Sequence, residues 1–361
     1  MKNYFRLLFC VCFICLLSFE SCFGQHIYEN SIKRFKYSSL DSIFTALVKN
    51  KKITIGVAII DFEDNQRWSK NYSNDKFTDS LGTKNGIKFP TLSVYKFHLA
   101  LTILKEVDKG KFDLNDELFI TKEDLLEETY SPLRNDLKKE YKENYEEKVK
   151  NGVFIKLSKL LSYSVSKSDN NACDILFRLL GGKNYKINED ISIEIRKKHN
   201  QKGVEKTNKF IKKLGLKHTI IAASEEKMHE SFDNQYLNTT TPLDAVSLLK
   251  HFYQGKILKK ETQDFLWKLL VETRTGSNKI KAGLPQNDKI ILGHKTGSSF
   301  RKEAEKGQEF GLKAAENDIG IVITEKNTYA VAIFIKNSTE SNEVNNTLIA
   351  ELSKMIFEYL D

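Results

Sequence analysis

Cysteine is scarce in this chain, and most of it lies near the N-terminus. Four of the five cysteines fall within the first 22 residues, which leaves Cys173 alone in the remainder. If the chain is cleaved near Gly24, no intramolecular disulfide can form, so the fold must be stabilised by its core. Cys173 begins an apolar helical stretch, where we expect a packed small hydrophobic residue rather than a nucleophile.

Patterns for binding metals or nucleic acids are also missing. The seven histidines show no His-x-His or His-x-x-x-His spacing, so neither a metal site nor a cofactor is predicted. The net charge of +9 comes from interspersed Lys and Glu rather than a basic cluster, which argues against a nucleic-acid partner. The densest charge run, residues 136–148, mixes both signs and predicts a solvated helix or an insertion loop.

Linkers and repeats are absent from the sequence as well. The chain has four prolines, and neither a Gly/Ser-rich linker nor an internal repeat is visible. At 361 residues, 40% of them hydrophobic, it can bury a large core. These features predict one large domain or two closely packed domains.

The first 24 residues have the pattern of a targeting segment. Lys2 and Arg6 precede an apolar stretch, residues 7–19, that is short for a membrane span and suits a signal peptide. We predict cleavage near Gly24; the alternative is lipidation of Cys22, which Glu20 disfavours. Both predict an exported, periplasmic protein without a stable membrane span.

Three short motifs stand in a fixed order: Ser93-Val94-Tyr95-Lys96, Ser168-Asp169-Asn170 and Lys295-Thr296-Gly297. Together they offer a nucleophilic hydroxyl, an amine beside it, a second hydroxyl for proton delivery and a cation on a strand. Ser-x-x-Lys by itself is a weak signal, because five other pairs match it: Ser73/Lys76, Ser164/Lys167, Ser224/Lys227, Ser247/Lys250 and Ser299/Lys302.

Local context selects the first of these pairs. Residues 89–92 form a turn signal before Ser93, and the apolar residues that follow recur at helical spacing: Phe97, Leu101, Leu104 and Val107. This pattern places Ser93 in the first turn of a helix and Lys96 one turn on, on the same side. The alternative is that Ser93 is only an N-cap and Lys96 a solvated side chain.

The other two motifs also have a structural context. Ser168-Asp169-Asn170 falls between two helical stretches, residues 157–165 and 172–180, in a connection that can face a cleft. Lys295-Thr296-Gly297 occurs once and follows an apolar run, residues 289–294, that predicts a strand ending at the motif. The alternatives are a capping segment for the first and a strand terminus with a solvated lysine for the second.

With these motifs in order, the chain resembles the class A serine β-lactamases, within the wider family of penicillin-binding serine acyltransferases. Residues 89–97, 168–174 and 275–285, the last leading into 294–297, resemble the extended-spectrum cephalosporinases of Bacteroidetes. The resemblance runs from about residue 27 to the C-terminus.

The resemblance implies an α/β fold of the β-lactamase/transpeptidase type, an antiparallel sheet flanked by helices with an inserted all-α domain. The sequence has β-rich runs at 53–60, near Trp68, at 290–292, 319–324 and 329–335, and a terminal helical pattern at 346–359. We therefore expect a sheet domain from 27–89 and 289–361, a helical domain from 90–288, and an active site in the seam.

The resemblance also implies roles for individual residues. Ser93 would be the nucleophile, and Ser168 would pass a proton to the departing lactam nitrogen. Lys96 and Glu225, the latter through a water, remain alternative bases for acylation, and Glu225 would be the base for deacylation. The residues implied in substrate binding are Asn170, Lys295, Thr296, Gly297, Ser298 and Tyr130. Tyr130 can equally be a loop-packing residue.

Some positions depart from the usual family pattern. His229 stands where the usual residue is Asn, and counting back four residues from it selects Glu225 as the base, with the adjacent Glu226 as the alternative. Asp174 also replaces an Asn. The usual carboxylate-binding Arg has no clear counterpart, and Lys279 or Arg274 is expected to substitute.

The predicted function is hydrolysis of β-lactam antibiotics by a monomer that needs no cofactor, conferring resistance. The alternatives are a D-alanyl-D-alanine peptidase or transpeptidase and a penicillin-binding sensor, both of which acylate without efficient deacylation. The carboxylate segment around Glu225 favours the hydrolase. A glutaminase with the same Ser-x-x-Lys opening is disfavoured by Lys295-Thr296-Gly297.

Overall fold

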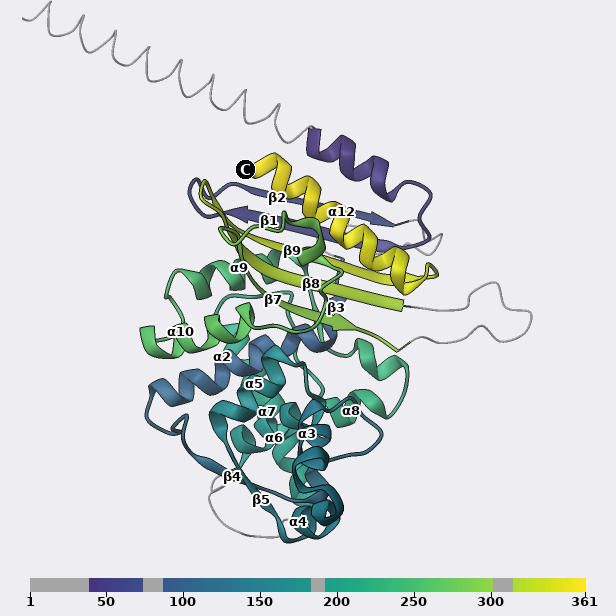
Figure 1. Ribbon diagram of the computed structural model, residues 1–361. Coiled ribbons are helices and arrows are strands. Elements are labelled where there is room, and N and C mark those ends of the chain that lie inside the picture. The colour runs from purple at the N-terminus through teal and green to yellow at the C-terminus, as the bar shows by residue number, and fades with distance from the viewer. Residues whose placement is uncertain (1–38, 74–86, 183–191, 301–313) are drawn as a thin grey trace, which may run out of the picture. The chain divides into compact units, whose positions relative to one another are not determined.

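The computed structural model describes residues 39–73, 87–182, 192–300 and 314–361 (Figure 1). The chain divides into two compact units, residues 1–49 and residues 50–361. The first contributes a helix over residues 39–48. The predicted signal peptide, with Cys22, lies outside the described residues. Within the described ranges, no helix combines the length and the hydrophobicity needed to cross a membrane.

A five-stranded antiparallel sheet forms one layer of the second unit. Its strands are β1 (Thr54–Asp61), β2 (Arg67–Ser73), β7 (Ile291–Ser298), β8 (Ala314–Ile323) and β9 (Thr328–Ser338), in the order β2-β1-β9-β8-β7. β1 pairs with β9 over its whole length, with Ile59 opposite Val331. The sheet is therefore built from both ends of the chain, as the sequence predicts.

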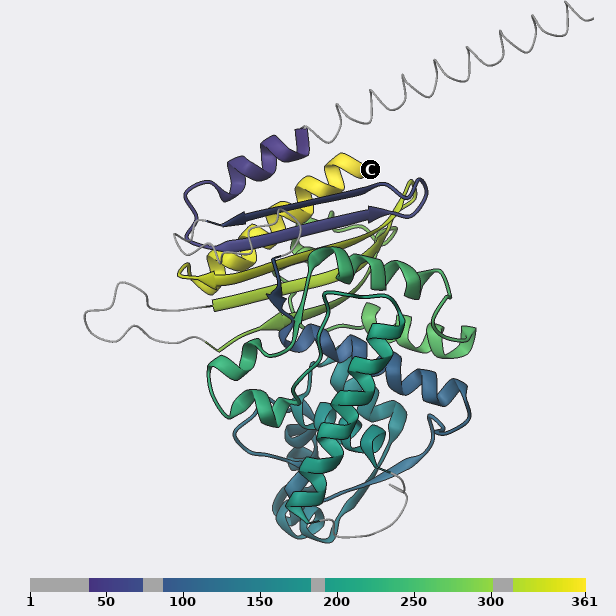
Figure 2. The ribbon, with the colours of Figure 1, turned by 180° about the vertical axis from the view of Figure 1, so that it is seen from behind.

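Helices cover both faces of this sheet. α12 (Asn342–Leu360) lies across one face and α9 (Pro242–Tyr253) packs on the other, against β1 and β9 (Figures 1 and 2). α9 covers one face of β1, which is buried along nearly its whole length and is apolar rather than alternating. The C-terminal helix confirms the predicted apolar pattern at 346–359.

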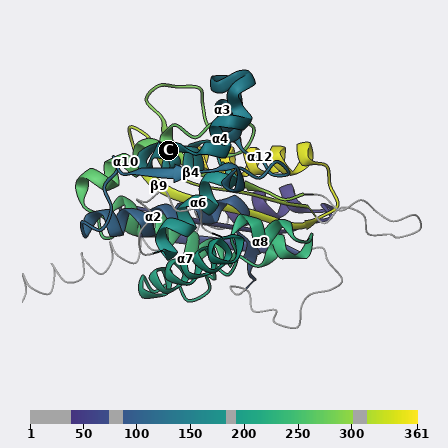
Figure 3. The same cartoon turned by 90° about the horizontal axis from the view of Figure 1, so that it is seen from below.

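The remaining residues form a mostly helical layer beside the sheet. Its helices are α2 (Tyr95–Asp108), α3 (Pro132–Tyr141), α4 (Tyr145–Asn151), α5 (Leu157–Ser166), α6 (Asn170–Gly181), α7 (Ile193–Lys213), α8 (Glu225–His229) and α10 (Lys260–Val271). The short helix α11 (Ile280–Gly283) follows α10 in the chain and lies outside this layer. Two short strand pairs interrupt it: β3 (Phe89–Pro90) with β6 (Thr239–Thr240), and β4 (Glu117–Ile120) with β5 (Val153–Lys156). α6 is buried throughout and lies between α7 and α3 (Figure 3).

The boundaries of the helical layer differ in detail from the expected insertion. α9 packs on the sheet and α11 packs on α12, although both fall inside residues 90–288. Residues 50–361 cluster as a single compact unit, so the division into two domains stays a prediction. The charge run at 136–148 spans the end of α3 and the start of α4 and is largely exposed, which confirms a solvated helical segment.

Candidate active site

Ser93 lies in a tight turn that feeds directly into α2. The turn is a 3₁₀ helix, Leu92–Val94, so Ser93 precedes the α-helix rather than occupying its first turn. Leu92 has a positive φ of 47°, a conformation that a branched side chain rarely adopts. The turn is held from two sides: Thr91 N donates to Asn238 O at 2.8 Å, and Asn317 Nδ2 donates to Pro90 O at 2.7 Å.

Gly297 brings the strand β7 against this turn. A Cβ added at Gly297 would lie 2.9 Å from both Leu92 Cβ and Thr91 O, and 3.2 Å from Ser93 N. Only glycine fits without moving the backbone of the Ser93 turn. The sequence predicts that Lys295-Thr296-Gly297 ends a strand. In the structure the motif lies inside β7, because residues 295–298 pair with residues 316–319 of β8.

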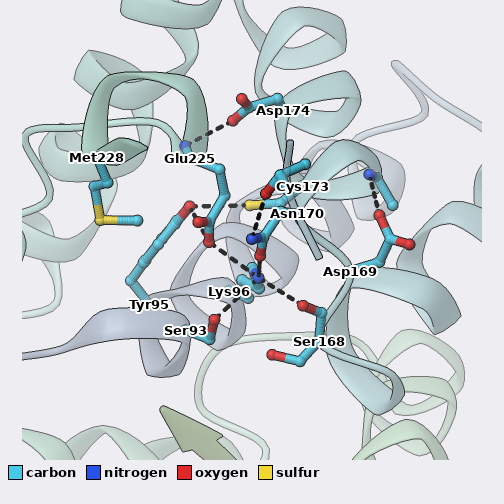
Figure 4. Close-up of polar contacts among 12 residues, drawn as sticks. Ser93, Tyr95, Lys96, Ser168, Asp169, Asn170, Cys173, Asp174, Glu225 and Met228 are labelled. Atoms are coloured by element: carbon cyan, nitrogen blue, oxygen red, sulfur yellow. Dashed lines mark hydrogen bonds and ion pairs between the residues drawn. The ribbon is translucent and has the colours of Figure 1, made fainter. Parts of the chain in front are cut away.

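Lys96 occupies the centre of a cluster of oxygen atoms (Figure 4). Its Nζ lies 3.0 Å from Ser93 Oγ, 2.8 Å from Ser168 O, 2.5 Å from Asn170 Oδ1 and 2.9 Å from Glu225 Oε1. An ammonium carries three hydrogens and cannot donate to four oxygens at once. If Lys96 gives up a proton to a neighbour, its nitrogen becomes an acceptor for the Ser93 hydroxyl.

Ser168 lies in the short connection between α5 and α6, as the sequence predicts. It has a positive φ of 59°, which turns the backbone so that its carbonyl meets Lys96 while its hydroxyl meets Lys295. The next residue, Asp169, caps α6 through Ala172 N and also accepts from Leu133 N. Asp169 therefore fixes the loop, and burial raises the pKa of its carboxyl.

Asn170 is held on both ends of its amide. Its Oδ1 accepts from Lys96, and its Nδ2 donates to Thr129 Oγ1 at 2.8 Å. Thr129 precedes Tyr130, whose backbone carbonyl accepts from Asn170 N at 3.1 Å. These contacts tie the Ser168 loop to the segment that carries Tyr130.

Lys295 approaches Ser168 from the sheet side. Its Nζ is completely buried and donates to Ser168 Oγ at 2.8 Å. Burial, and next the charge of Lys96, hold the pKa of Lys295 well below its usual range. Since Lys295 donates to the Ser168 oxygen, the hydroxyl hydrogen of Ser168 is directed elsewhere. Thr296, the next residue, pairs its hydroxyl with that of Thr275.

The two adjacent glutamates of α8 point to different surroundings. The side chain of Glu225 is 6% exposed and contacts Lys96 at 2.9 Å. The side chain of Glu226 is 33% exposed, and its carboxylate lies 3.7 Å from Lys197 Nζ and 3.5 Å from Asn200 Nδ2. The structure therefore brings Glu225, and not Glu226, to Lys96.

Asp174 and His229 anchor α8 above the site. The Asp174 carboxylate accepts from the backbone N–H groups of both Glu225 and Glu226, each at 2.8 Å. His229 Nδ1 lies 2.7 Å from Glu225 O, and its Nε2 lies 3.2 Å from Thr129 Oγ1. Burial, followed by the charge of Glu225, raises the pKa of Asp174 to about 7. Both departures from the usual family pattern thus position the glutamate.

The cation at the other end of the site is already paired. Lys279 Nζ contacts Glu316 Oε2 at 2.8 Å and Ser298 Oγ at 3.1 Å, with both charged side chains almost fully buried. Ser298 Oγ in turn donates to Glu316 at 2.6 Å. Arg274, the alternative cation, is exposed and does not line the cavity beside Ser93 among the described residues.

A cavity of 510 Å³ opens onto these groups; we call it the Ser93 cavity. It is lined by Ser93, Ser168, Asn170 and Glu225 together with Thr296–Phe300, and its rim includes Tyr130. Tyr130 is 56% exposed, which places it at the mouth rather than in a packed loop. A second cavity of 340 Å³ adjoins it and shares Asn170, Glu225 and His229. Across the described ranges, no group of three His, Cys, Asp or Glu is arranged to hold a metal ion.

The family follows from comparison with known proteins. The model of the β-lactamase enzyme family matches residues 39–192 and 200–360. The chain belongs to this β-lactamase enzyme family. It is 33% identical to a β-lactamase of Bacteroides uniformis over 348 residues, 96% of this chain and 98% of the relative. It is 32% identical to Beta-lactamase VEB-1 of Pseudomonas aeruginosa over 347 residues, 95% of this chain and 96% of the relative.

Solved β-lactamase structures give the same answer for the fold. A class A β-lactamase from Bacteroides cellulosilyticus is 32% identical, with a TM-score of 0.71 over 90% of this chain and 98% of that chain. The TLA-1 extended-spectrum β-lactamase is 36% identical with the same TM-score and the same coverage. The predicted β-lactamase/transpeptidase-type fold and the class A resemblance are confirmed.

The sequence motifs of this β-lactamase did not point to Tyr95. It stands inside the first motif, is fully buried, and donates its hydroxyl hydrogen to Glu225 Oε1 at 3.0 Å. The sequence feature that could have pointed to Tyr95 is a hydroxyl-bearing side chain at a helix position that is buried among apolar residues. Cys173 is buried in the core, as predicted, and its Sγ also contacts the Tyr95 hydroxyl, at 3.2 Å.

Proposed function

We propose that this β-lactamase hydrolyses penicillins and cephalosporins through an acyl-enzyme on Ser93, that Glu225 is the base for its deacylation, and that it thereby confers resistance. One observation supports this most directly. Glu225 Oε1 lies 2.9 Å from Lys96 Nζ, which lies 3.0 Å from Ser93 Oγ. A carboxylate at this place is the group that a penicillin-binding peptidase or sensor lacks, so the hydrolase is favoured.

In acylation, Ser93 Oγ attacks the lactam carbonyl and its proton passes to Lys96 or, through a water, to Glu225. The two bases remain alternatives because both belong to one hydrogen-bonded cluster. The backbone N–H groups of Ser93 and Ser298 would hold the oxyanion. The C–N bond then breaks, and Ser168 relays a proton to the lactam nitrogen: its hydroxyl gives up its hydrogen and receives in turn the proton that the base took from Ser93.

In deacylation, Glu225 takes a proton from a water whose oxygen attacks the ester carbonyl of Ser93. The ester bond breaks, and Ser93 Oγ recovers a proton from the same cluster. Substrate binding would use the charge of Lys295 and the hydroxyl of Thr296 for the carboxylate, joined by the Ser298 hydroxyl once its hydrogen turns from Glu316 to the substrate. Asn170 would bind the amide of the acyl side chain, and Tyr130 would wall the cavity.

Lys279 is proposed as the second cation near the substrate carboxylate, because it lines the Ser93 cavity while Arg274 does not. Its charge is largely balanced by Glu316, so its part in binding is indirect: it orients the Ser298 hydroxyl.

We also propose that the protein is exported to the periplasm as a monomer after removal of residues 1–24. The charged and apolar pattern of the N-terminus supports export. N-terminal sequencing of the protein recovered from a periplasmic extract would test it, and a lipid on Cys22 would contradict cleavage near Gly24.

The test of the catalytic assignment uses two neighbouring glutamates. Glu225→Gln keeps the side-chain shape but removes the basic oxygen, so a cephalosporin adduct on Ser93 should accumulate and be visible by mass spectrometry. Glu226→Gln is the matched control and should turn over like the wild type. If the adduct accumulated only in Glu226→Gln, the deacylation base would be Glu226 instead of Glu225. A wild type that itself stalls would identify a penicillin-binding protein.

A further inference from the structure

Tyr95 places a hydroxyl against the proposed deacylation base. Its ring is buried and stacks on Phe177, with the centroids 5.8 Å apart and the planes 12° from parallel. Its hydroxyl reaches Glu225 Oε1 at 3.0 Å and Cys173 Sγ at 3.2 Å (Figure 4). A phenylalanine would make the same ring contacts, so packing alone does not account for the hydroxyl.

The direction of the hydrogen bonds follows from the donors present. An ionised carboxylate only accepts, so the Tyr95 O–H donates to Glu225 and the Cys173 S–H is left to donate to the Tyr95 oxygen. Burial raises the pKa of Tyr95 well above its usual value. The hydroxyl therefore keeps its hydrogen at any pH at which the enzyme works, and Tyr95 cannot act as a base.

Glu225 has several charged or titratable neighbours. Lys96 Nζ contacts its Oε1, and His229 Nδ1 lies 3.9 Å from its Oε2. The Asp174 carboxylate accepts from its backbone N–H, and Lys295 lies within electrostatic range. Lys96 shares its hydrogens with the Ser93, Ser168 and Asn170 oxygens and is itself an alternative base for acylation. The Tyr95 hydroxyl also donates to the Glu225 carboxylate, and its hydrogen takes no part in the proton transfers between Lys96 and Ser93.

We propose that Tyr95 is a positioning residue for deacylation, whose hydroxyl holds the Glu225 carboxylate charged and correctly oriented for the attacking water. The inference rests on the proposed function of Glu225. A hydrogen bond to the charged form of an acid favours that form, and a buried carboxylate without enough donors is more readily protonated. Acylation can use Lys96, which contacts Ser93 Oγ directly, whereas deacylation has Glu225 alone as its proposed base. Deacylation should therefore depend on the Tyr95 hydroxyl more than acylation does.

The test is Tyr95→Phe in the purified full chain, with acylation and deacylation by a chromogenic cephalosporin resolved by stopped flow between pH 5 and 9. We expect deacylation to slow by about tenfold at pH 7, the effect of losing one hydrogen bond to a charged group. The acidic limb of the deacylation rate should move to higher pH in the variant. Acylation should change by less than about threefold.

Two further variants separate positioning from packing. Tyr329→Phe removes another buried hydroxyl, one on β9 without a hydrogen-bond partner among the described residues, and should change neither rate. In a Glu225→Gln background, Tyr95→Phe should have little further effect on adduct lifetime, because the two residues act through one group. Thermal melting of each variant reports any loss of fold.

Three results would overturn the inference. They are a Tyr95→Phe enzyme with the wild-type deacylation rate and pH profile, equal loss of acylation and deacylation with a lower melting temperature, and full additivity with Glu225→Gln. If the wild type itself never turns over, the proposed function fails and the inference with it. If the wild type turns over and Tyr95→Phe matches it, only the inference fails.

Discussion

The Ser93 cavity has a buried lysine–glutamate pair at each end, and the two pairs differ in what surrounds them. Lys96 and Glu225 are 2.9 Å apart, and Lys279 and Glu316 are 2.8 Å apart, with all four side chains almost fully buried. Residue type, distance and burial are thus nearly the same at both ends. The neighbouring serine distinguishes them.

At the Lys279–Glu316 pair, Ser298 is hydrogen-bonded to both charged side chains. Its Oγ accepts from Lys279 and donates to Glu316, while Lys279 also donates to the carbonyls of Gly297 and Asn317. In the part of the chain that the structure describes, Ser93 Oγ has Lys96 as its one hydrogen-bond partner. The Ser298 hydrogen is committed to a carboxylate, whereas the Ser93 hydrogen can be transferred. The difference in reactivity between the two ends therefore lies in the neighbouring serine: the Ser93 hydroxyl can give its hydrogen to Lys96, and the Ser298 hydroxyl cannot.

We call Lys96–Glu225 the open pair and Lys279–Glu316 the closed pair. The largest effect should come from removing Lys96, the lysine of the open pair. Lys96→Met leaves Ser93 without a base in contact and should lower kcat/KM by about 10³–10⁴-fold. Steady-state hydrolysis of a chromogenic cephalosporin measures it. Lys279→Met, the matched change in the closed pair, should have a much smaller effect on rate. Comparable losses of kcat/KM in Lys96→Met and Lys279→Met would show that the two lysine–glutamate pairs do not differ in their part in catalysis.

The closed pair should instead matter for stability. Lys279→Met leaves the Glu316 carboxylate buried without its cation, so the free energy of unfolding should fall by about 3–5 kcal/mol. Denaturant titration checks this. Replacing both partners with apolar residues, Lys279→Met with Glu316→Leu, should recover much of the loss. A single variant as stable as the wild type would show that the pair is not structural.

Lys295, between the two pairs, should affect substrate recognition. Lys295→Ala should lower kcat/KM by about 10²-fold, mainly through KM, because a charged hydrogen bond to the substrate carboxylate is lost. Since the pKa of Lys295 lies well below its usual range, its ammonium loses its charge at a lower pH than a free lysine does. KM should therefore rise towards alkaline pH.

Lys295→Arg provides the control for this pH dependence, since a guanidinium stays charged throughout the range. The rise in KM should flatten in this variant even if its absolute affinity is lower. A KM that rises equally in the wild type and in the Arg variant would assign the titration to another group.

The smallest effect should be on the pH dependence of folding stability, through Asp174, which holds the helix that carries Glu225 of the open pair. Because its pKa is raised to about 7 in the folded protein, the folded state holds an extra proton between about pH 4 and pH 7. Its contribution to stability is therefore complete below pH 4 and is lost as the pH rises through 7. Asp174→Asn should remove this slope, which is about 1.4 kcal/mol per pH unit between pH 4 and pH 7.

Melting temperatures of the wild type and the Asp174→Asn variant at pH 5 and pH 8 measure the difference. The variant also loses one acceptor for the backbone N–H groups of α8, so its absolute stability can fall while its slope flattens. Parallel slopes in the two proteins would show that Asp174 does not titrate in this window.

The sequence alone determined the fold class and the family. Apolar runs at both ends of the chain, with helical patterns between them, predict a sheet closed by distant segments, and the pairing of β1 with β9 confirms it. The turn signal before Ser93 and the apolar helical spacing after it selected Ser93 among six Ser-x-x-Lys pairs, and the order of the three motifs indicated the family. These inferences succeed because periodicity and motif order are local or one-dimensional properties.

The tertiary structure alone decided which oxygens and cations meet. It showed Lys279 paired with Glu316 and brought the Tyr95 hydroxyl to a carboxylate 130 residues away. The count back from His229 had already selected Glu225 over Glu226, and the structure adds that Glu225 contacts Lys96 while Glu226 faces Lys197. No sequence pattern encodes these contacts, because they depend on the angle at which α8 and β7 meet the Ser93 turn. That angle is set by the packing of buried side chains and by the close approach at Gly297, which involve residues distant in the chain.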